Sequence, residues 1–224
     1  MDRDIEAEKQ MAAEAAVSWA RPGMSVGLGT GTTVEYLLPA LARHAEGLRC
    51  VSTSPRTEEL ARGLGISVES FSGPAGVAHL DLAIDGADQV DPQGWLVKGG
   101  GAAHTREKRV AASADVFIVI VSSNKIVNRL TAPIPLELLD YGLAATLRDL
   151  REIGDVQVRD APRSPDGGVI ADYLGPVDDP QDLSLRLAAL PGVVEHGLFP
   201  PSMVTTVLIG RGDFVEQRDV ARRP

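Results

Sequence analysis

Short apolar segments alternate with helical patterns along the first 121 residues, and this alternation restricts the fold more than any other feature. Apolar residues from Ile5 to Trp19 have helical spacing and predict a helix of roughly four turns, which Pro22-Gly23 ends. Met24–Leu28 reads as a short buried strand. The same order then repeats, with helices predicted near 34–41, 57–64 and 105–113 and strands at 50–52, 80–84 and 116–121. The alternation predicts an α/β domain, Rossmann-like, with a mostly parallel sheet flanked by helices.

The pattern changes after residue 130. Strands are predicted at 134–136, 156–158, 168–171 and 193–195, and helices at 143–153 and 180–190. The order β-α-β-β-α-β is that of a ferredoxin-like unit. We therefore expect a small α+β domain at 131–200 and a large domain formed by 1–130 and 201–224, to which a strand at 203–209 returns.

Charge and composition exclude several classes of protein. The 22 Lys and Arg against 31 Asp and Glu give a net charge of −9, and no basic run precedes Arg222-Arg223, so nucleic-acid binding is not expected. No stretch approaches the ~20 apolar residues of a membrane span. The acidic start Met1-Asp2-Arg3-Asp4 lacks the pattern of a secretory signal, and a lone cysteine, Cys50, fits a reducing compartment; both predict a cytoplasmic protein. One cysteine and scattered histidines predict no metal site.

A glycine-rich turn, Gly27-Leu-Gly-Thr-Gly-Thr-Thr33, lies between a predicted strand and a predicted helix. Glycines allow backbone amides to turn towards an anion, and the helix N-terminus adds partial positive charge. A phosphate would fit. A tight turn with threonine capping explains the same residues equally well.

Two aspartates, Asp85 and Asp88, follow the predicted strand at 80–84, at the edge where open α/β sheets place ligands. The pair could contact sugar hydroxyls, bind a cation or orient a lysine. An Asx-turn would need one of the two carboxylates and no ligand.

Three consecutive glycines, Gly99 to Gly101, follow Lys98 and precede the helix at 105–113. Three glycines are entropically costly and indicate close approach of the backbone to another group. Lys98 could stabilise an oxyanion and Glu107 could act as a general base, although a solvated helical glutamate is the simpler interpretation. His104 is interpreted as structural or exposed rather than as a ligand.

Together these segments resemble the A-type ribose-5-phosphate isomerase family over nearly the whole chain. Val26–Thr33 resembles its GxGTGST phosphate loop, and Asp85–Asp88 its DGAD motif. The KGGG and TREK motifs are similar to Lys98–Gly101 and Thr105–Lys108. Ser123-Asn124-Lys125, then Pro133–Glu137, and Pro191–Phe199 are similar to later signatures.

The resemblance implies interconversion of D-ribose 5-phosphate and D-ribulose 5-phosphate in the non-oxidative pentose phosphate pathway. It implies no cofactor, a sugar phosphate as the small-molecule partner, and a homodimer or homotetramer. Glu107 would move a proton between C2 and C1 through a cis-enediol, Lys98 would stabilise the enediolate oxygen, and Asp85 and Asp88 would hold the sugar hydroxyls, assist ring opening and orient Lys98. The implied substrate-binding residues are Thr30, Gly31, Thr32, Thr33, Gly86, Ala87, Gly99, Gly100, Gly101 and Lys125.

Four positions depart from the family pattern. Gln89 stands where DGADE has an acid, His104 where a leucine precedes TREK, Asn124 within the segment typically read DES, and Thr32 where serine is usual. These departures motivate an alternative: a divergent, non-catalytic sugar-phosphate-binding or regulatory paralogue. A nucleotide-dependent Rossmann enzyme is a third hypothesis, but the turn at Gly27 lacks the last glycine of the dinucleotide fingerprint.

Overall fold

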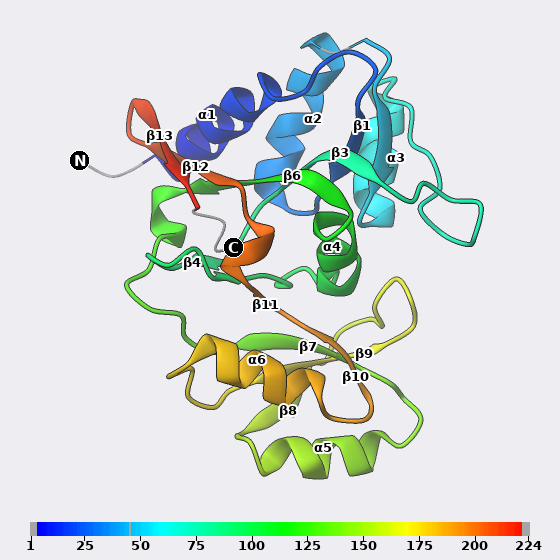
Figure 1. The fold of residues 1–224 in the computed structure, drawn as a ribbon, viewed down its shortest axis with the longest axis vertical. Coiled ribbons are helices and arrows are strands. Elements are labelled where there is room, and N and C mark those ends of the chain that lie inside the picture. The colour runs from blue at the N-terminus through cyan, green and yellow to red at the C-terminus, as the bar shows by residue number, and fades with distance from the viewer. Residues whose placement is uncertain (1–3, 45, 221–224) are drawn as a thin grey trace. The chain divides into compact units, whose positions relative to one another are not determined.

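The computed structural model describes residues 4–44 and 46–220, and these divide into two units (Figure 1). The large unit takes its described residues from 1–87, 106–126 and 201–224, and the small unit consists of 88–105 and 127–200. The division predicted at residues 130 and 200 stays a prediction; the units differ from it in that 88–105 and 127–130 belong with the small one. The start at residues 1–3 and the Arg222-Arg223 pair lie outside the described residues.

A six-stranded sheet in the order β13-β12-β6-β3-β1-β2 forms the large unit. All neighbouring strands are parallel except β12 and β13. The strands are β1 (Ser25–Leu28), β2 (Arg49–Ser52), β3 (Leu80–Asp85), β6 (Ala114–Ser122), β12 (Thr206–Arg211) and β13 (Phe214–Asp219). The helices are α1 (Ile5–Val17), α2 (Thr32–His44), α3 (Pro55–Gly63) and α4 (His104–Ala111), of which α4 begins in the small unit. The predicted α/β class with a mostly parallel sheet is confirmed.

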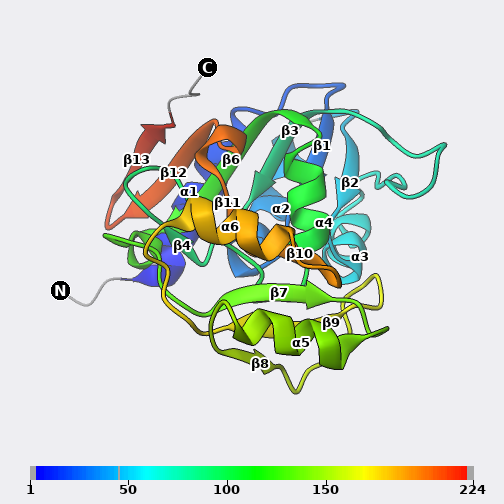
Figure 2. The ribbon, with the colours of Figure 1, turned by 60° about the horizontal axis from the view of Figure 1, so that its bottom comes forward.

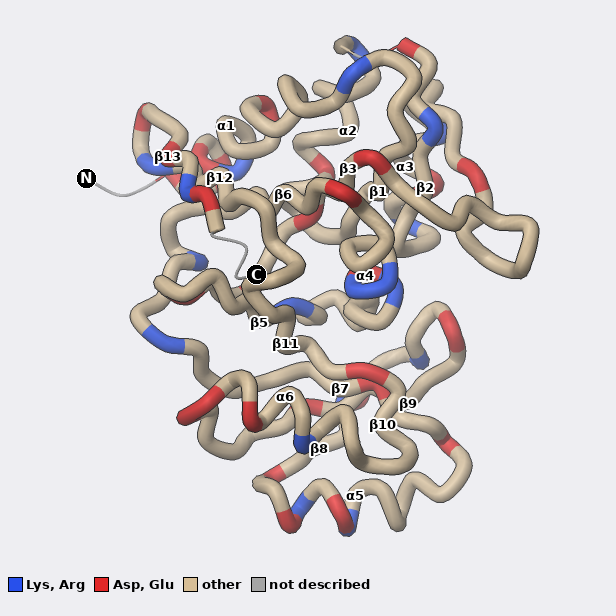
Figure 3. Tube along the Cα trace, in the orientation of Figure 1, with Lys and Arg blue, Asp and Glu red and all other residues tan. Residues whose placement is uncertain are grey.

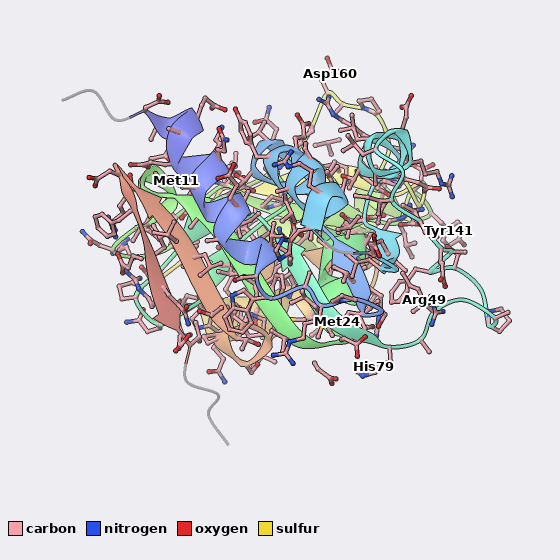
Figure 4. All side chains as sticks on the ribbon, turned by 90° about the horizontal axis from the view of Figure 1, so that it is seen from above. Met11, Met24, Arg49, His79, Tyr141 and Asp160 are labelled. Atoms are coloured by element: carbon pink, nitrogen blue, oxygen red, sulfur yellow. The ribbon has the colours of Figure 1, made fainter. Side chains whose placement is uncertain are left out.

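Successive side chains of a strand point to opposite faces of the sheet, and the two faces of this sheet pack against different helices. Val26 and Leu28 belong to a core shared with α1 and α2, which lie across the strands in Figure 4. Gly27 points to the other face, where a Cβ would lie 2.3 Å from Val110 of α4. Glycine at 27 therefore allows α4 to pack closely on β1.

The small unit contains the predicted β-α-β-β-α-β order. Its strands β7 (Ile134–Leu138), β8 (Val156–Val158), β9 (Val169–Tyr173) and β10 (Val193–His196) form an antiparallel sheet in the order β10-β7-β9-β8. Helices α5 (Leu143–Arg151) and α6 (Pro180–Ala188) lie alongside it (Figure 2). Leu150 and Leu187 from these helices share one core with Leu136 and Ala171. The ferredoxin-like expectation is confirmed.

Four strands were not predicted. Three are two residues long, namely β4 (Gln89–Val90), β5 (Leu96–Val97) and β11 (Leu198–Phe199), and they form a separate sheet in the order β11-β5-β4. Two residues are too few to show a period of two. The fourth, β13, is mostly polar and partly exposed at the sheet edge. The predicted strand at 203–209 begins later, as β12, because Pro201–Met203 forms a 3₁₀ turn, η2.

In Figure 3, Lys and Arg are interspersed with Asp and Glu along the described trace. None of the helices within residues 4–44 and 46–220 has the length and apolar character needed to cross a membrane.

Candidate active site

The predicted site residues of the large unit, apart from Glu107 on α4, lie at or just after the carboxyl ends of parallel strands. Strands β1, β3 and β6 are parallel neighbours, so these ends lie at one edge of the sheet. The loop at Thr30–Thr33 follows β1, Asp85 ends β3 and Gly86 and Ala87 follow it, and Lys125 lies in a 3₁₀ turn, η1 (Ser123–Lys125), after β6. The strand order reverses between β1 and β3, because the chain runs from β1 to β2 on one side and then to β3 on the other. Open α/β sheets bind ligands at such a switch point.

Asp85 fixes the glycine-rich loop from the β3 side. Its Oδ1 accepts hydrogen bonds from the amides of Thr30 (3.1 Å) and Gly86 (2.7 Å), and the side chain is 3% exposed. A Cβ at Gly29 would lie 2.0 Å from the Asp85 carboxyl, so this approach requires glycine. Gly31 has φ +121°, a conformation that side-chain-bearing residues rarely adopt. The structure thus brings the first two predicted motifs into direct contact.

Two threonines that sequence reasoning missed support the same loop from the β2 side. Thr53 lies 2.7 Å from Thr30, oxygen to oxygen, and the Thr57 hydroxyl donates to the Gly29 carbonyl at 3.0 Å. Thr57 is held in turn by Ser54, which caps α3. The available signal was position: Thr53 follows β2, the strand beside β1. The loop backbone is therefore held on both sides, and the first-turn amides of α2 have no intrahelical acceptor.

The turn that carries Lys125 is anchored by a buried acid, Glu8 of α1. Glu8 is 1% exposed and accepts hydrogen bonds from the amides of Ser123 (2.8 Å) and Gly212 (2.9 Å). Asn124, one of the departures from the family pattern, accepts from the Ser122 hydroxyl at 2.6 Å. Sequence reasoning did not single out Glu8, since its position among α1 acids looks solvated.

Glu107 is buried, not solvated. It lies in the first turns of α4 and is 4% exposed. Charged side chains are almost never buried unless they are paired or functional. The interpretation of Glu107 as an ordinary solvated helical glutamate is therefore wrong.

The small unit holds the other predicted site residues. Lys98 is 2% exposed, and its Nζ lies 5.6 Å from the centroid of the Phe199 ring, within cation–π range. The Lys98 amide donates to the Gly197 carbonyl at 2.9 Å. The two backbones are so close that a Cβ on Gly197 would lie 2.2 Å from the Lys98 carbonyl oxygen. Lys98 is therefore buried, with a fixed backbone and an aromatic ring beside its ammonium group.

The triglycine segment is held against Asp88. The Gly100 amide donates to Asp88 Oδ2 at 2.9 Å, and the Asp88 amide donates to the Val97 carbonyl at 2.8 Å. Gly99 has φ +104°, and a Cβ there would lie 2.6 Å from His104 Nδ1. His104 is fully buried. Its position agrees with the interpretation of His104 as a structural residue and contradicts the interpretation of His104 as an exposed one.

Thr105, in the same first turn of α4 as Glu107, is hydrogen-bonded to a buried carboxylate on β7. Glu137, 2% exposed, accepts hydrogen bonds from the hydroxyls of Thr105 and Ser164, and the Gly168 amide donates to Ser164 at 3.0 Å. Sequence reasoning noted Glu137 as part of a family signature but assigned it no contact. Its place in the structure is that of a buried acceptor for hydroxyl groups.

The departure at Gln89 has a structural reason. Its side-chain amide makes a two-point contact with the backbone of Thr131: Oε1 accepts from the Thr131 amide at 2.8 Å, and Nε2 donates to the Thr131 carbonyl at 2.9 Å. A glutamate could accept but not donate here. Among the described residues no group of three or more His, Cys, Asp or Glu side chains is placed to hold a metal ion.

Comparisons with known proteins place the chain in a family. The model of ribose 5-phosphate isomerase A (phosphoriboisomerase A) matches residues 49–213. A ribose-5-phosphate isomerase A of Methanosarcina acetivorans is 42% identical over 219 residues, covering 92% of this chain and 91% of the relative. The crystal structure of ribose 5-phosphate isomerase A from Neisseria gonorrhoeae superposes with a TM-score of 0.91 at 29% identity, over 98% of this chain and 99% of that one.

A second solved structure, a D-ribose-5-phosphate isomerase in complex with phospho-erythronic acid, superposes with a TM-score of 0.89 at 32% identity, over 96% and 99% of the two chains. High coverage of both partners means that the match includes both units rather than a shared sheet alone. The chain belongs to the ribose 5-phosphate isomerase A family.

Proposed function

We propose that this protein interconverts D-ribose 5-phosphate and D-ribulose 5-phosphate, with Glu107 as the base. The observation that carries the proposal is the burial of three charged side chains of the family motifs, Asp85, Lys98 and Glu107, each no more than 4% exposed. Burying charge is costly, and a chain without the reaction would gain nothing from retaining all three.

The chemistry assigned to these residues is proton transfer between adjacent carbons. Glu107 removes the C2 proton of the opened aldose, and the electron pair of that C–H bond forms the C1–C2 double bond while the C1 carbonyl pair moves onto O1. The C2 hydroxyl proton passes to O1, and the same carboxyl returns a proton to C1 as the carbonyl forms at C2. Lys98 stabilises the enediolate oxygen, and its burial strengthens that interaction relative to water. Asp85 and Asp88 hold the sugar hydroxyls, assist ring opening and orient Lys98.

Phosphate binding is assigned to Thr30, Gly31, Thr32 and Thr33 at the N-terminus of α2, where the first-turn amides have no intrahelical acceptor. Lys125 adds a positive charge. Gly86, Ala87 and the triglycine segment Gly99–Gly101 supply further substrate contacts through the backbone. We assign no metal or organic cofactor to the reaction.

The test is ribulose 5-phosphate formation by the purified protein, with and without EDTA. We expect turnover in EDTA, and a loss of about 10²- to 10⁴-fold in Glu107→Gln at unchanged circular dichroism. Glu59→Gln, an exposed position on α3, is the matched control and should retain full turnover. Near-normal turnover by folded Glu107→Gln would refute the assignment of the base.

Solvent deuterium separates this proposal from a binding-only paralogue. An enzyme that works through an enediol exchanges the transferred proton with solvent, so sugar recovered from D₂O should carry deuterium at C1 or C2. A protein that binds ribose 5-phosphate without incorporating deuterium would be the non-catalytic paralogue.

Assembly and location are proposed on the same basis. We propose a homodimer or homotetramer, which light scattering of the eluting protein would distinguish from a monomer. A cytoplasmic location agrees with the free, buried state of Cys50.

A further inference from the structure

Arg159, directly after β8, contacts the triglycine segment from sixty residues away. Its Nη1 donates to the Gly99 carbonyl at 3.1 Å and to the Gly100 carbonyl at 3.2 Å. The contact lies within the small unit, which also contains the carboxylate that pairs with Arg159. The residues involved are Arg159, Asp172, Gly99 and Gly100. Neither Arg159 nor Asp172 belongs to a motif that the sequence predicts to be functional.

The guanidinium is itself held in place. Nε and Nη2 donate to the two carboxylate oxygens of Asp172 on β9, at 2.7 and 2.6 Å, and both side chains are 19% exposed. A two-point pair of this kind fixes the plane of the guanidinium as well as its position. Nη1 is therefore aimed at the glycine carbonyls.

One peptide group is held at both ends. In a trans peptide the carbonyl and the amide point in opposite directions. The peptide between Gly99 and Gly100 gives its carbonyl to Arg159 and its amide to Asp88 Oδ2, at 2.9 Å. Because Asp88 accepts from this amide, a rotation of the peptide would also release the Asp88 carboxylate.

Glycine has the widest choice of backbone conformations, so three in sequence need an external restraint to adopt one. We propose that Arg159, oriented by Asp172, is a positioning residue that holds the triglycine segment so that Asp88 and Lys98 keep their places for the reaction. This inference rests on the proposed function for its effect on turnover, but not for its effect on the backbone.

The main variants are Arg159→Ala and Arg159→Lys. Lysine keeps the charge and much of the stem, but an ammonium cannot pair with both Asp172 oxygens and both carbonyls in one plane. We expect kcat for ribose 5-phosphate to fall about 10- to 100-fold in Arg159→Ala and by a smaller factor in Arg159→Lys, as for a small displacement of catalytic groups. The inhibition constant of inorganic phosphate should stay within twofold, because the loop assigned to phosphate lies in the large unit.

Arg163→Ala is the matched control. Arg163 lies four residues further along the same loop and pairs with Asp140 at 3.0 Å, with side chains 50% and 66% exposed. It should leave kcat and phosphate inhibition unchanged. Equal kcat in the Arg159 and Arg163 variants, or a loss of kcat that only follows the loss of folded protein, would overturn the proposal.

Amide hydrogen exchange provides a readout that needs no activity. A peptide covering Lys98–Gly101 should exchange faster in Arg159→Lys than in wild type and Arg163→Ala, while a peptide covering the large unit's loop at 29–33 should not change. Unchanged exchange at 98–101 would overturn the inference whether or not the protein isomerises ribose 5-phosphate. An inactive wild type with faster exchange at 98–101 in Arg159→Lys would overturn the proposed function alone.

Discussion

The two glycine-rich segments of this protein are stabilised in different ways. The loop at Gly29–Gly31 is held by residues at or beyond the ends of neighbouring parallel strands. Asp85, the last residue of β3, accepts from the Thr30 amide, and Thr57, beyond β2, donates to the Gly29 carbonyl. The segment at Gly99–Gly101 follows a two-residue strand and is held by Asp88 and by Arg159, a residue of the ferredoxin-like layer.

The difference shows two sources of rigidity. In a parallel sheet all carboxyl ends meet at one edge, so the supports of the first loop follow from strand order. The second segment has no such neighbours. Its support is a charged pair brought by an antiparallel sheet, which stabilises it only as long as that sheet is folded.

Substituting a glycine in the first loop is expected to have the largest effect. In Gly29→Ala the new methyl would meet the Asp85 carboxyl, 2.0 Å from the ideal Cβ position, and displace either the loop or Asp85. We expect kcat/KM to fall about 100-fold or more, with a loss of unfolding free energy of about 1 to 3 kcal/mol. Steady-state kinetics and urea denaturation measure the two effects.

Gly63→Ala controls for the substitution itself, because a Cβ there has no neighbour within 4 Å. Gly100→Ala gives the comparison between segments, since its Cβ would lie 3.1 Å from the Asp88 oxygens and needs a smaller shift. If Gly100→Ala lost more kcat/KM than Gly29→Ala, the first loop would not be the more tightly constrained of the two.

How much of this could be predicted from sequence also differs between the segments. The periodicity predicted β1, β3 and the helices after them, so the meeting of Thr30 and Asp85 at one edge could be inferred. The Arg159 contact could not, because β4, β5 and β11 are too short to show a pattern and the pair spans sixty residues. Burial of Glu107 and Glu8 was equally hidden, since acids among other charged residues on a helix look solvated until the packing is known.

Glu137 tests how far the small unit's buried polar contacts contribute to stability. Glu137→Ala removes the acceptor for the hydroxyls of Thr105 and Ser164 and leaves a cavity. We expect a loss of about 3 kcal/mol in the free energy of unfolding, measured by urea denaturation. Glu152→Ala, exposed at the end of α5, should change stability by less than about 0.5 kcal/mol. Equal stability of the two variants would mean that the Glu137 contacts are not stabilising.

Gln89→Glu tests the departure from the family pattern. The variant restores the family's acid but replaces the Nε2 donor by a carboxylate oxygen facing the Thr131 carbonyl. We expect a loss of about 1 kcal/mol in unfolding free energy, measured by thermal denaturation. The kcat should fall less than twofold. Gln93→Glu, exposed in the adjacent turn, serves as the control. A more stable Gln89→Glu protein would show that the amide contact does not explain the departure.

The smallest effect is expected at the opposite edge of the large sheet, where Asp81 repeats the bonding of Asp85. Asp81 Oδ2 accepts from the amide and hydroxyl of Ser25, both at 2.7 Å, and these hydrogen bonds lower the pKa of Asp81. A lowered folded-state pKa stabilises the protein above the unfolded pKa, and the stabilisation is lost as pH falls through the folded value. Asp81 is exposed, so Asp81→Asn should reduce the unfolding free energy at pH 7 by about 0.5 kcal/mol or less, and the difference from wild type should vanish in strong acid.

The kcat/KM of Asp81→Asn should equal that of wild type, because the amino ends of β1 and β3 carry no site residue. A kinetic defect in Asp81→Asn as large as that of Gly29→Ala would mean that anchoring β1 to β3 matters anywhere along the strands, and not specifically at the carboxyl edge.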